Sequence, residues 1–141
     1  MLLPLIYTPR AEKRFEVGVV PHYVDRDAVR VNDPSVTIID VRSDWRSVIE
    51  QIAECETIPS SSLHGLIVAE AYRIPALWTT ITDKVAGEGF KFRDYYLSTE
   101  REPPEPLAWN DALAKIGPCL TEPPRVNTAP LLGAWPRELT F

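Results

Sequence analysis

Compact apolar runs alternate with apolar positions at helical spacing through most of the chain. Such a run predicts a buried strand, and the one richest in β-branched residues, 36–41, is typical of a parallel sheet. The four predicted strands are residues 15–20, 36–41, 56–59 and 74–78. Helical spacing predicts a helix over residues 45–53, with Ser43 as its N-cap, and a buried helix over residues 63–72. Strands that alternate with helices imply an α/β fold, with a parallel sheet covered on both faces.

Proline is concentrated near the end of the chain, where eight of the 14 prolines lie in residues 103–141. Because proline interrupts long helices and central strands, we expect this part to be an extended tail. It should contain one short helix over residues 108–116, closed by a Gly-Pro pair. The tail is expected to pack on the domain formed by residues 1–102 or on a partner chain. Residues 90–96 mix aromatic and charged side chains and fit either an edge strand or a short helix.

The most informative segment is residues 57–72, which predicts a short strand, a turn containing Ser60, Ser61 and Ser62, and then a helix. The helix is apolar nearly all the way round, which is typical of a buried helix, and His64 lies in its first turn. A helix N-terminus carries about half a positive charge and several unpaired N–H donors, so the turn predicts a site for a phosphate or carboxylate group. The alternative is structural: Ser62 is an N-cap, the other two serines are solvated, and His64 is a hydrogen-bonded interior histidine.

Three segments follow predicted strands directly, namely residues 21–25, 42–44 and 60–65. In open α/β sheets, ligands bind beyond the carboxyl ends of the strands. Both histidines of the chain, His22 and His64, fall in these segments. This is the arrangement that a binding site at that edge of the sheet would produce.

Composition narrows the classes of function. The 141 residues suit one domain with a sizeable core, and the net charge of −5 argues against a general nucleic-acid or anionic-membrane surface. No apolar run approaches the roughly 18 residues of a membrane span, and the N-terminus lacks the basic region of a signal peptide. Cys55 and Cys119 lie far apart and suggest free thiols in a cytoplasmic protein. No metal-ligand spacing is visible, so no metal and no cofactor are predicted.

Several segments, taken together and in order, resemble the C-terminal half of the polysaccharide pyruvyl transferase family, and most closely its exopolysaccharide (succinoglycan-type) ketal pyruvyl transferases. The segments that carry the resemblance are residues 18–25, 39–41, 60–72, 74–75 and 91–96. The Ser-Ser-Ser-Leu-His-Gly block is the specific part. The resemblance implies a Rossmann-like sheet similar to the C-terminal domain of a GT-B fold. The chain departs from the family pattern in two ways. It has no counterpart to the family's N-terminal domain, and Arg73 stands where a glycine is common.

The resemblance implies transfer of the pyruvyl group of phosphoenolpyruvate to two hydroxyls of a saccharide acceptor, with residues 1–102 as the donor-binding domain. The implied substrate-binding residues are Ser60, Ser61, Ser62, His64, Gly65, Arg42 and Arg93. The two arginines are candidate clamps for the donor carboxylate, and Glu70 is a candidate buried partner for one of them. His64 is expected to contact the phosphate or act as general acid. His22 is a second catalytic candidate, with a hydrogen-bonded histidine at a strand end as its alternative.

Two other classes of function fit the same residues. One is the C-terminal domain of a GT-B glycosyltransferase, whose nucleotide sugar would use the helix N-terminus and a carboxylate near Glu70; the small number of glycines, six, argues against it. The other is a non-catalytic half that needs a partner. That partner would be a second copy of the chain or a separate chain that supplies the N-terminal half.

Overall fold

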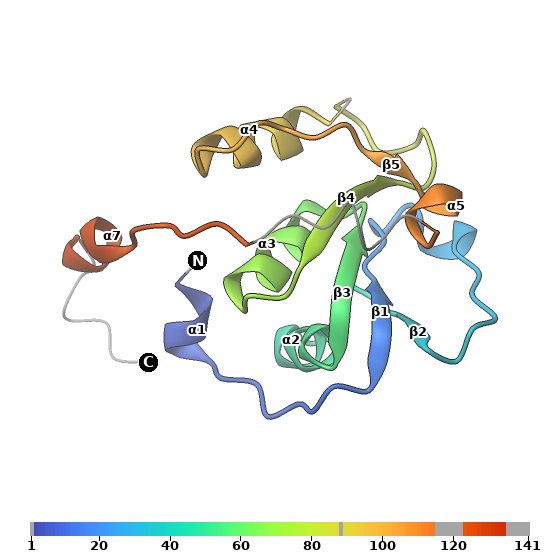
Figure 1. The fold of residues 1–141 in the computed structure, drawn as a ribbon, viewed down its shortest axis with the longest axis horizontal. Coiled ribbons are helices and arrows are strands. Elements are labelled where there is room, and N and C mark those ends of the chain that lie inside the picture. Colours follow the sequence, from blue (N-terminus) through green and yellow to red (C-terminus); the bar gives the residue numbers. More distant parts are fainter. Residues whose placement is uncertain (1, 88, 115–122, 135–141) are drawn as a thin grey trace.

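Five parallel strands form one sheet within residues 2–87, 89–114 and 123–134, the parts of the chain that the computed structural model describes (Figure 1). The strands are β1 Phe15–Val19, β2 Val36–Ile38, β3 Cys55–Ser60, β4 Ala76–Thr80 and β5 Leu107–Ala108. Their order in the sheet is β2-β1-β3-β4-β5, and every neighbouring pair is parallel. The predicted α/β class and the four predicted strands are therefore confirmed.

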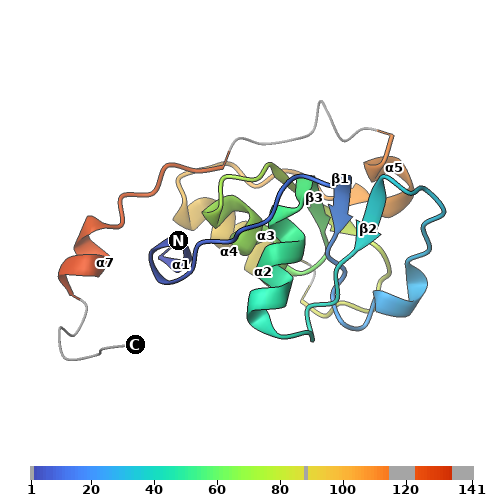
Figure 2. The ribbon, with the colours of Figure 1, turned by 90° about the horizontal axis from the view of Figure 1, so that it is seen from below.

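The helices connect the strands in the manner expected for a parallel sheet. The described helices are α1 Leu3–Ile6, the 3₁₀ helix η1 Arg26–Ala28, α2 Trp45–Ala53, α3 Leu63–Ala71, α4 Phe90–Ser98, α5 Trp109–Ala112 and α7 Ala129–Gly133. From β1 the chain passes through η1 to β2 on one side, and from β2 it crosses back over β1 and continues through α2, α3 and α4. Right-handed crossovers in opposite directions place η1 on one face of the sheet and α2 and α3 on the other (Figures 1 and 2).

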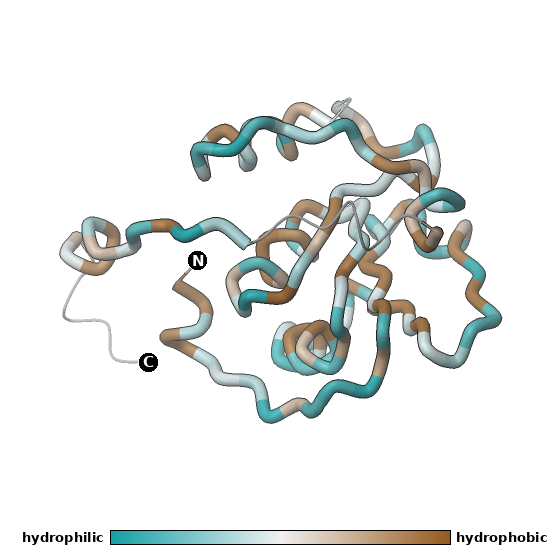
Figure 3. Tube along the Cα trace, viewed as in Figure 1, coloured by the Kyte–Doolittle hydropathy of each residue, from teal (hydrophilic) through white to brown (hydrophobic). Residues whose placement is uncertain are grey.

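Each face of the sheet is covered by its own apolar cluster. The larger cluster joins the sheet to the three longer helices through Ile52, Ile58, Leu66, Phe92 and Tyr96. The smaller cluster contains Val17, Val19 and Val29, with Trp109 of α5 packed against it. In Figure 3 the hydrophobic positions gather in the strands and the helices that face them, whereas the segment leading into β1 is mostly hydrophilic. Across the described part of the chain, no helix has the length and apolar character needed to cross a membrane.

Local chemistry explains where the boundaries differ from those predicted. The N-cap of α2 is Asp44 and not Ser43, because the Asp44 carboxylate accepts the N–H groups of Arg46 (3.0 Å) and Ser47 (3.4 Å). Residues 90–96 form a helix, since Gly89 begins it with a φ of 77° and both Phe92 and Tyr96 are buried one turn apart.

The last third of the chain contributes an edge strand that the sequence did not predict. β5 has two residues and pairs with β4, and Pro106 lies just before it, where an edge strand tolerates proline. α5 covers Trp109–Ala112 of the helix predicted over 108–116, and the remainder from residue 115, with its Gly-Pro pair, lies outside the described residues. In Figures 1 and 2, α7 lies apart from the sheet.

Arg73, the residue that departs from the family pattern, adopts the left-handed conformation that a glycine would suit, with a φ of 63°. The Arg73 guanidinium donates hydrogen bonds to the carbonyls of Pro123 (2.9 Å) and Pro124 (3.2 Å). Arg73 therefore ends α3 as a glycine would and also attaches a distant proline-rich segment to the fold.

Candidate functional site

The order of the strands reverses direction between β1 and β3, which are neighbours in the sheet although β2 separates them in the sequence. At their carboxyl ends the two strands remain joined: Val20, just after β1, bridges Ser60, the last residue of β3, and the Ser61 N–H donates to the Val20 carbonyl (3.2 Å). In open α/β sheets this reversal leaves a crevice in which ligands bind. The serine turn and His22 both lie at this point.

The Ser60 side chain stabilises the serine turn through hydrogen bonds to the backbone. Its side chain is completely buried, and Oγ lies 2.9 Å from the Val20 carbonyl oxygen and 2.7 Å from that of Ser62, while it accepts the Ser62 N–H (3.1 Å). A Cβ on Gly65 would lie 2.5 Å from Val20 Cγ1 and 2.6 Å from Ser60 Oγ. The glycine therefore lets the start of α3 approach the strands, and the Ser60 hydroxyl serves the backbone of the turn.

Ser61 connects the turn to the loop after β1. Its Oγ accepts the backbone N–H of His22 (2.9 Å) and donates to Oδ2 of Asp25 (2.8 Å). Ser61 and Asp25 are both buried, and both contribute to the wall of a cavity of about 520 Å³. The Ser61 hydroxyl thus fixes where His22 lies relative to the start of α3.

The N-terminus of α3 follows the serine turn and carries backbone N–H donors that the helix itself does not use. Ser62 is its N-cap residue, as the structural alternative had it, but its side chain makes no capping hydrogen bond. The N–H groups of Leu63, His64 and Gly65 precede the first acceptor carbonyl that a helix can offer them, so they suit an anionic ligand. The helix is nine residues long, and its dipole favours negative charge at this end.

His64 lies in the first turn of α3, and His22 lies in the loop after β1. His64 is exposed, so the structural alternative of an interior histidine is wrong, and it lines a second cavity of about 220 Å³ with Trp45. His22 is partly buried, with its ring 4.4 Å from that of Tyr23. Burial and the nearby charge of Lys91, with a smaller contribution from His64, lower the pKa of His22 below 6.5, while Asp25 acts in the opposite direction.

The cavity of about 520 Å³ is lined by Ser61 and by residues at the start of α4. Lys91 and Arg93 of α4 line it, and the Arg93 guanidinium lies 5.5 Å from the centre of the Trp78 ring. Arg93 thus lines the same cavity as Ser61, and its role as a carboxylate clamp stays a prediction. The sequence analysis did not predict Lys91 as a site residue, although Lys91 belongs to the segment 91–96 that carries the resemblance. It lies in the first turn of the helix that follows Gly89.

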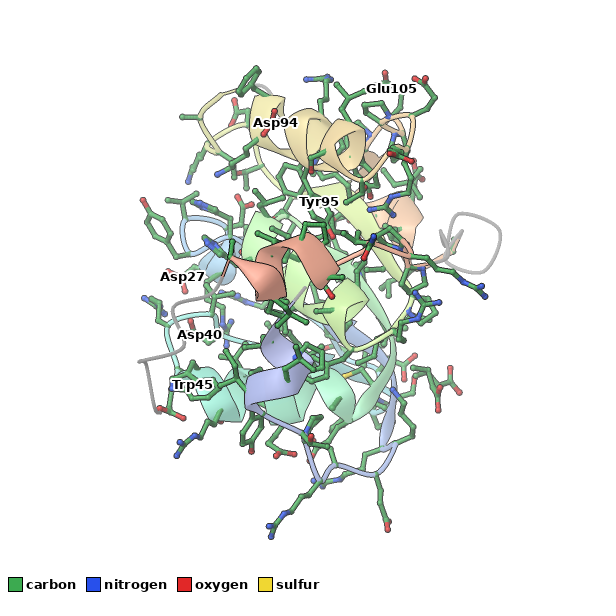
Figure 4. All side chains as sticks on the ribbon, turned by 90° about the vertical axis from the view of Figure 1, so that its left-hand side faces the viewer. Asp27, Asp40, Trp45, Asp94, Tyr95 and Glu105 are labelled. Carbon is green, nitrogen blue, oxygen red and sulfur yellow. The ribbon has the colours of Figure 1, made fainter. Side chains whose placement is uncertain are left out.

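The Arg42 side chain pairs with Asp40 at the surface and does not line the cavity that contains Ser61 and Arg93. Its guanidinium forms two hydrogen bonds with its neighbour Asp40 (3.0 and 2.7 Å), and its side chain is 64% exposed. These hydrogen bonds lower the pKa of Asp40 to about 2. The structure therefore does not bring Arg42 together with the other predicted site residues, and Figure 4 shows Asp40 at the surface, on the same side as Trp45.

Glu70 also has a partner other than the predicted ones. Its carboxylate accepts two hydrogen bonds from Arg101 (2.8 Å each) and one from the Tyr95 hydroxyl (2.6 Å), and not from Arg42 or Arg93. Burial and the hydrogen bond to Glu70 raise the pKa of Tyr95. This cluster lies near the C-terminus of α3, at the end away from the serine turn, so its carboxylate cannot contact a ribose bound at the helix N-terminus.

No group of three His, Cys, Asp or Glu side chains able to hold a metal ion occurs within the residues that the structure describes. The site offers imidazole, ammonium and guanidinium groups, hydroxyls and backbone N–H groups, and the carboxylates of Asp25, Asp83 and Glu105 also line its larger cavity. Apart from the carboxylates, these groups can bind an anion and transfer protons.

Comparison with known proteins finds similarity over part of the chain. The chain is 34% identical over 93 residues to an uncharacterized protein of Acanthamoeba polyphaga mimivirus, covering 61% of this chain and 32% of that protein. It is 36% identical over 92 residues to the succinoglycan biosynthesis protein ExoV of Rhizobium meliloti, covering 59% of this chain and 27% of ExoV. The matched region is thus a third or less of the length of either relative. No protein-family model matches the chain, and no solved structure matches it.

Proposed function

We propose that this chain is the phosphoenolpyruvate-binding part of a ketal pyruvyl transferase in exopolysaccharide biosynthesis. The observation that carries the proposal is the position of the serine turn, His22 and the N-terminus of α3 at the reversal point of the sheet, with Lys91 in the cavity that Ser61 also lines. The similarity to a succinoglycan biosynthesis protein supports the same class of pathway. Phosphoenolpyruvate is made in the cytoplasm, so this is where the reaction is expected to occur.

The donor has two anionic groups, and the site has two cationic centres. The first is the N-terminus of α3 with His64, where backbone N–H groups suit the three oxygens of a phosphate. The second is the pair of side chains Lys91 and Arg93 in the adjoining cavity, which suits a carboxylate. A ligand that places its phosphate over α3 and its carboxylate toward α4 would engage both.

The chemistry requires an acid, a base and stabilisation of the leaving phosphate. A proton is added to the methylene carbon of the donor, and one sugar hydroxyl attacks the adjacent carbon. A second hydroxyl then attacks the same carbon as phosphate leaves, which closes the ketal. His22, whose lowered pKa keeps it largely neutral at pH 7, suits the acceptance of a hydroxyl proton, and His64 suits the phosphate or the role of acid.

The chain matches only a third or less of the length of its relatives. We therefore assign binding of the saccharide acceptor, and the complete reaction, to a further domain or a partner chain. The alternative as a nucleotide-sugar glycosyltransferase is weakened by Glu70. That carboxylate is already occupied by Arg101 and Tyr95.

Calorimetric titration with phosphoenolpyruvate, inorganic phosphate and UDP-glucose tests the proposal. We expect phosphoenolpyruvate to bind at least about tenfold more tightly than phosphate, because charge-assisted hydrogen bonds to its carboxylate add roughly 1.5–3 kcal/mol. Lys91→Met should remove most of this preference. Lys13→Met is the matched control, because Lys13 contacts the Cys55 carbonyl at the opposite end of β3. Tighter binding of UDP-glucose, or no binding of phosphoenolpyruvate by the folded chain, would contradict the proposal.

A further inference from the structure

Asp25 is a completely buried carboxylate at the edge of the site. Its Oδ2 accepts a hydrogen bond from the Ser61 hydroxyl (2.8 Å), and its Oδ1 accepts one from the Thr82 hydroxyl (2.5 Å). Asp25 is also the N-cap residue of η1, but its side chain makes no capping hydrogen bond there. The carboxylate is therefore not used to begin that short helix.

Each of the two hydroxyls that donate to Asp25 also accepts a hydrogen bond from a backbone N–H group. Ser61 Oγ accepts the backbone N–H of His22 (2.9 Å), and Thr82 Oγ1 accepts the backbone N–H of Lys84 (3.2 Å). A hydroxyl has one proton, and an ionised carboxylate only accepts hydrogen bonds. Because both protons point to Asp25, both hydroxyl oxygens are oriented to receive the backbone N–H groups.

These hydrogen bonds join three loops that are far apart in the sequence. Asp25 and His22 belong to the loop after β1, Ser61 to the turn after β3, and Thr82 and Lys84 to the loop after β4. All three loops leave the carboxyl end of the sheet, and Asp25, Ser61 and Thr82 all line the cavity of about 520 Å³. The same carboxylate thus holds two walls of the cavity together.

A buried carboxylate costs free energy that an apolar residue would not. Among the ion pairs of the described residues, none involves Asp25, so its stabilisation comes from hydroxyl groups. In return, the hydrogen bonds of this carboxylate hold three loops at the carboxyl end of the sheet in a defined geometry.

We propose that Asp25 is a positioning residue, which through Ser61 sets His22 and through Thr82 sets the loop leading to α4. Its effect on phosphoenolpyruvate rests on the proposed function, whereas its effect on the loops does not. Asp25 does not touch the ligand in this account, because both of its oxygens are occupied by the two hydroxyls.

Amide hydrogen exchange on the full chain tests the positioning role directly. Asp25→Asn keeps the shape of the side chain but offers an acceptor to only one hydroxyl. We expect the amide of His22 or of Lys84, or both, to exchange at least tenfold faster and the Kd for phosphoenolpyruvate to rise at least tenfold. Asp27→Asn, the same change at an exposed position of η1, should alter neither quantity. Exchange rates at both amides that remain those of the wild type would overturn the proposal.

Thr82→Val provides a second, milder variant that removes one arm of the network. Here the amide of Lys84 should lose its protection while that of His22 keeps it, and phosphoenolpyruvate should again bind less tightly. If Lys84 is released without any change in affinity, the positioning role is wrong. If the wild-type chain does not bind phosphoenolpyruvate, the proposed function fails, and the exchange pattern still decides whether Asp25 holds the loops.

Discussion

Replacing Arg101 by methionine is expected to lower the free energy of unfolding by about 3–5 kcal/mol, because it leaves a buried carboxylate without its cation. The Glu70 side chain is fully buried, and Arg101 donates to both of its oxygens at 2.8 Å. In the variant only the Tyr95 hydroxyl would remain as a partner. Tyr95 extends from α4 toward the rest of the fold (Figure 4), so the three side chains fasten α3, α4 and the segment after α4 to one another.

Urea unfolding followed by circular dichroism measures this effect. Arg42→Met is the matched control: the same substitution removes an exposed ion pair with Asp40 and should leave the free energy of unfolding nearly unchanged. Adding Glu70→Gln to Arg101→Met should restore part of the loss, since the buried charge is then absent. An Arg101→Met variant as stable as the control would show that the pair contributes little.

Gly65→Ala is expected to have the second largest effect, by disturbing both the fold and the anion site. Alanine is usually favoured over glycine inside a helix by about 1 kcal/mol. At this position, however, the added Cβ would lie 2.5 Å from Val20 Cγ1, and overpacking of this kind costs about 1–3 kcal/mol. The contact with the strands should therefore outweigh helix propensity, and the start of α3 should move away from Val20 and Ser60.

The expected result for Gly65→Ala is a lower urea midpoint together with weaker binding of phosphoenolpyruvate. Gly133→Ala in α7 is the control, since its Cβ would meet nothing within 4 Å, and it should not lower the midpoint. A Gly65→Ala variant with unchanged midpoint and unchanged affinity would mean that the close approach of α3 to β1 is unimportant.

The sequence pattern was sufficient to predict those strands and helices whose apolar side chains pack into the core. The strand predicted at residues 15–20 was found as β1 Phe15–Val19, and the helix predicted at residues 63–72 was found as α3 Leu63–Ala71. β5 was not found, because two residues beside prolines have no period to detect. The N-cap of α2 was placed one residue early, since Ser43 and Asp44 are both good capping residues and only the backbone decides between them.

The site was predicted as a location, and its internal contacts were not. Alternating strands and helices place the serine turn and His22 at one edge of the sheet, which the sequence pattern alone implies. The hydrogen bond between Ser61 and Asp25 joins residues 36 positions apart, and that between Arg101 and Glu70 joins residues 31 positions apart. No local pattern encodes such pairs, so the roles of these side chains required the three-dimensional structure.

If phosphoenolpyruvate binds at the N-terminus of α3 beside His64 and His22, the histidine Cε1–H resonances will report it. The chain has two histidines, His22 and His64, so the spectrum contains two such signals. Phosphoenolpyruvate should shift both signals to saturation and raise the pKa of His22 from its lowered value, because a bound anion stabilises the imidazolium form. Saturable binding that leaves both signals unmoved would place the ligand elsewhere and contradict the account.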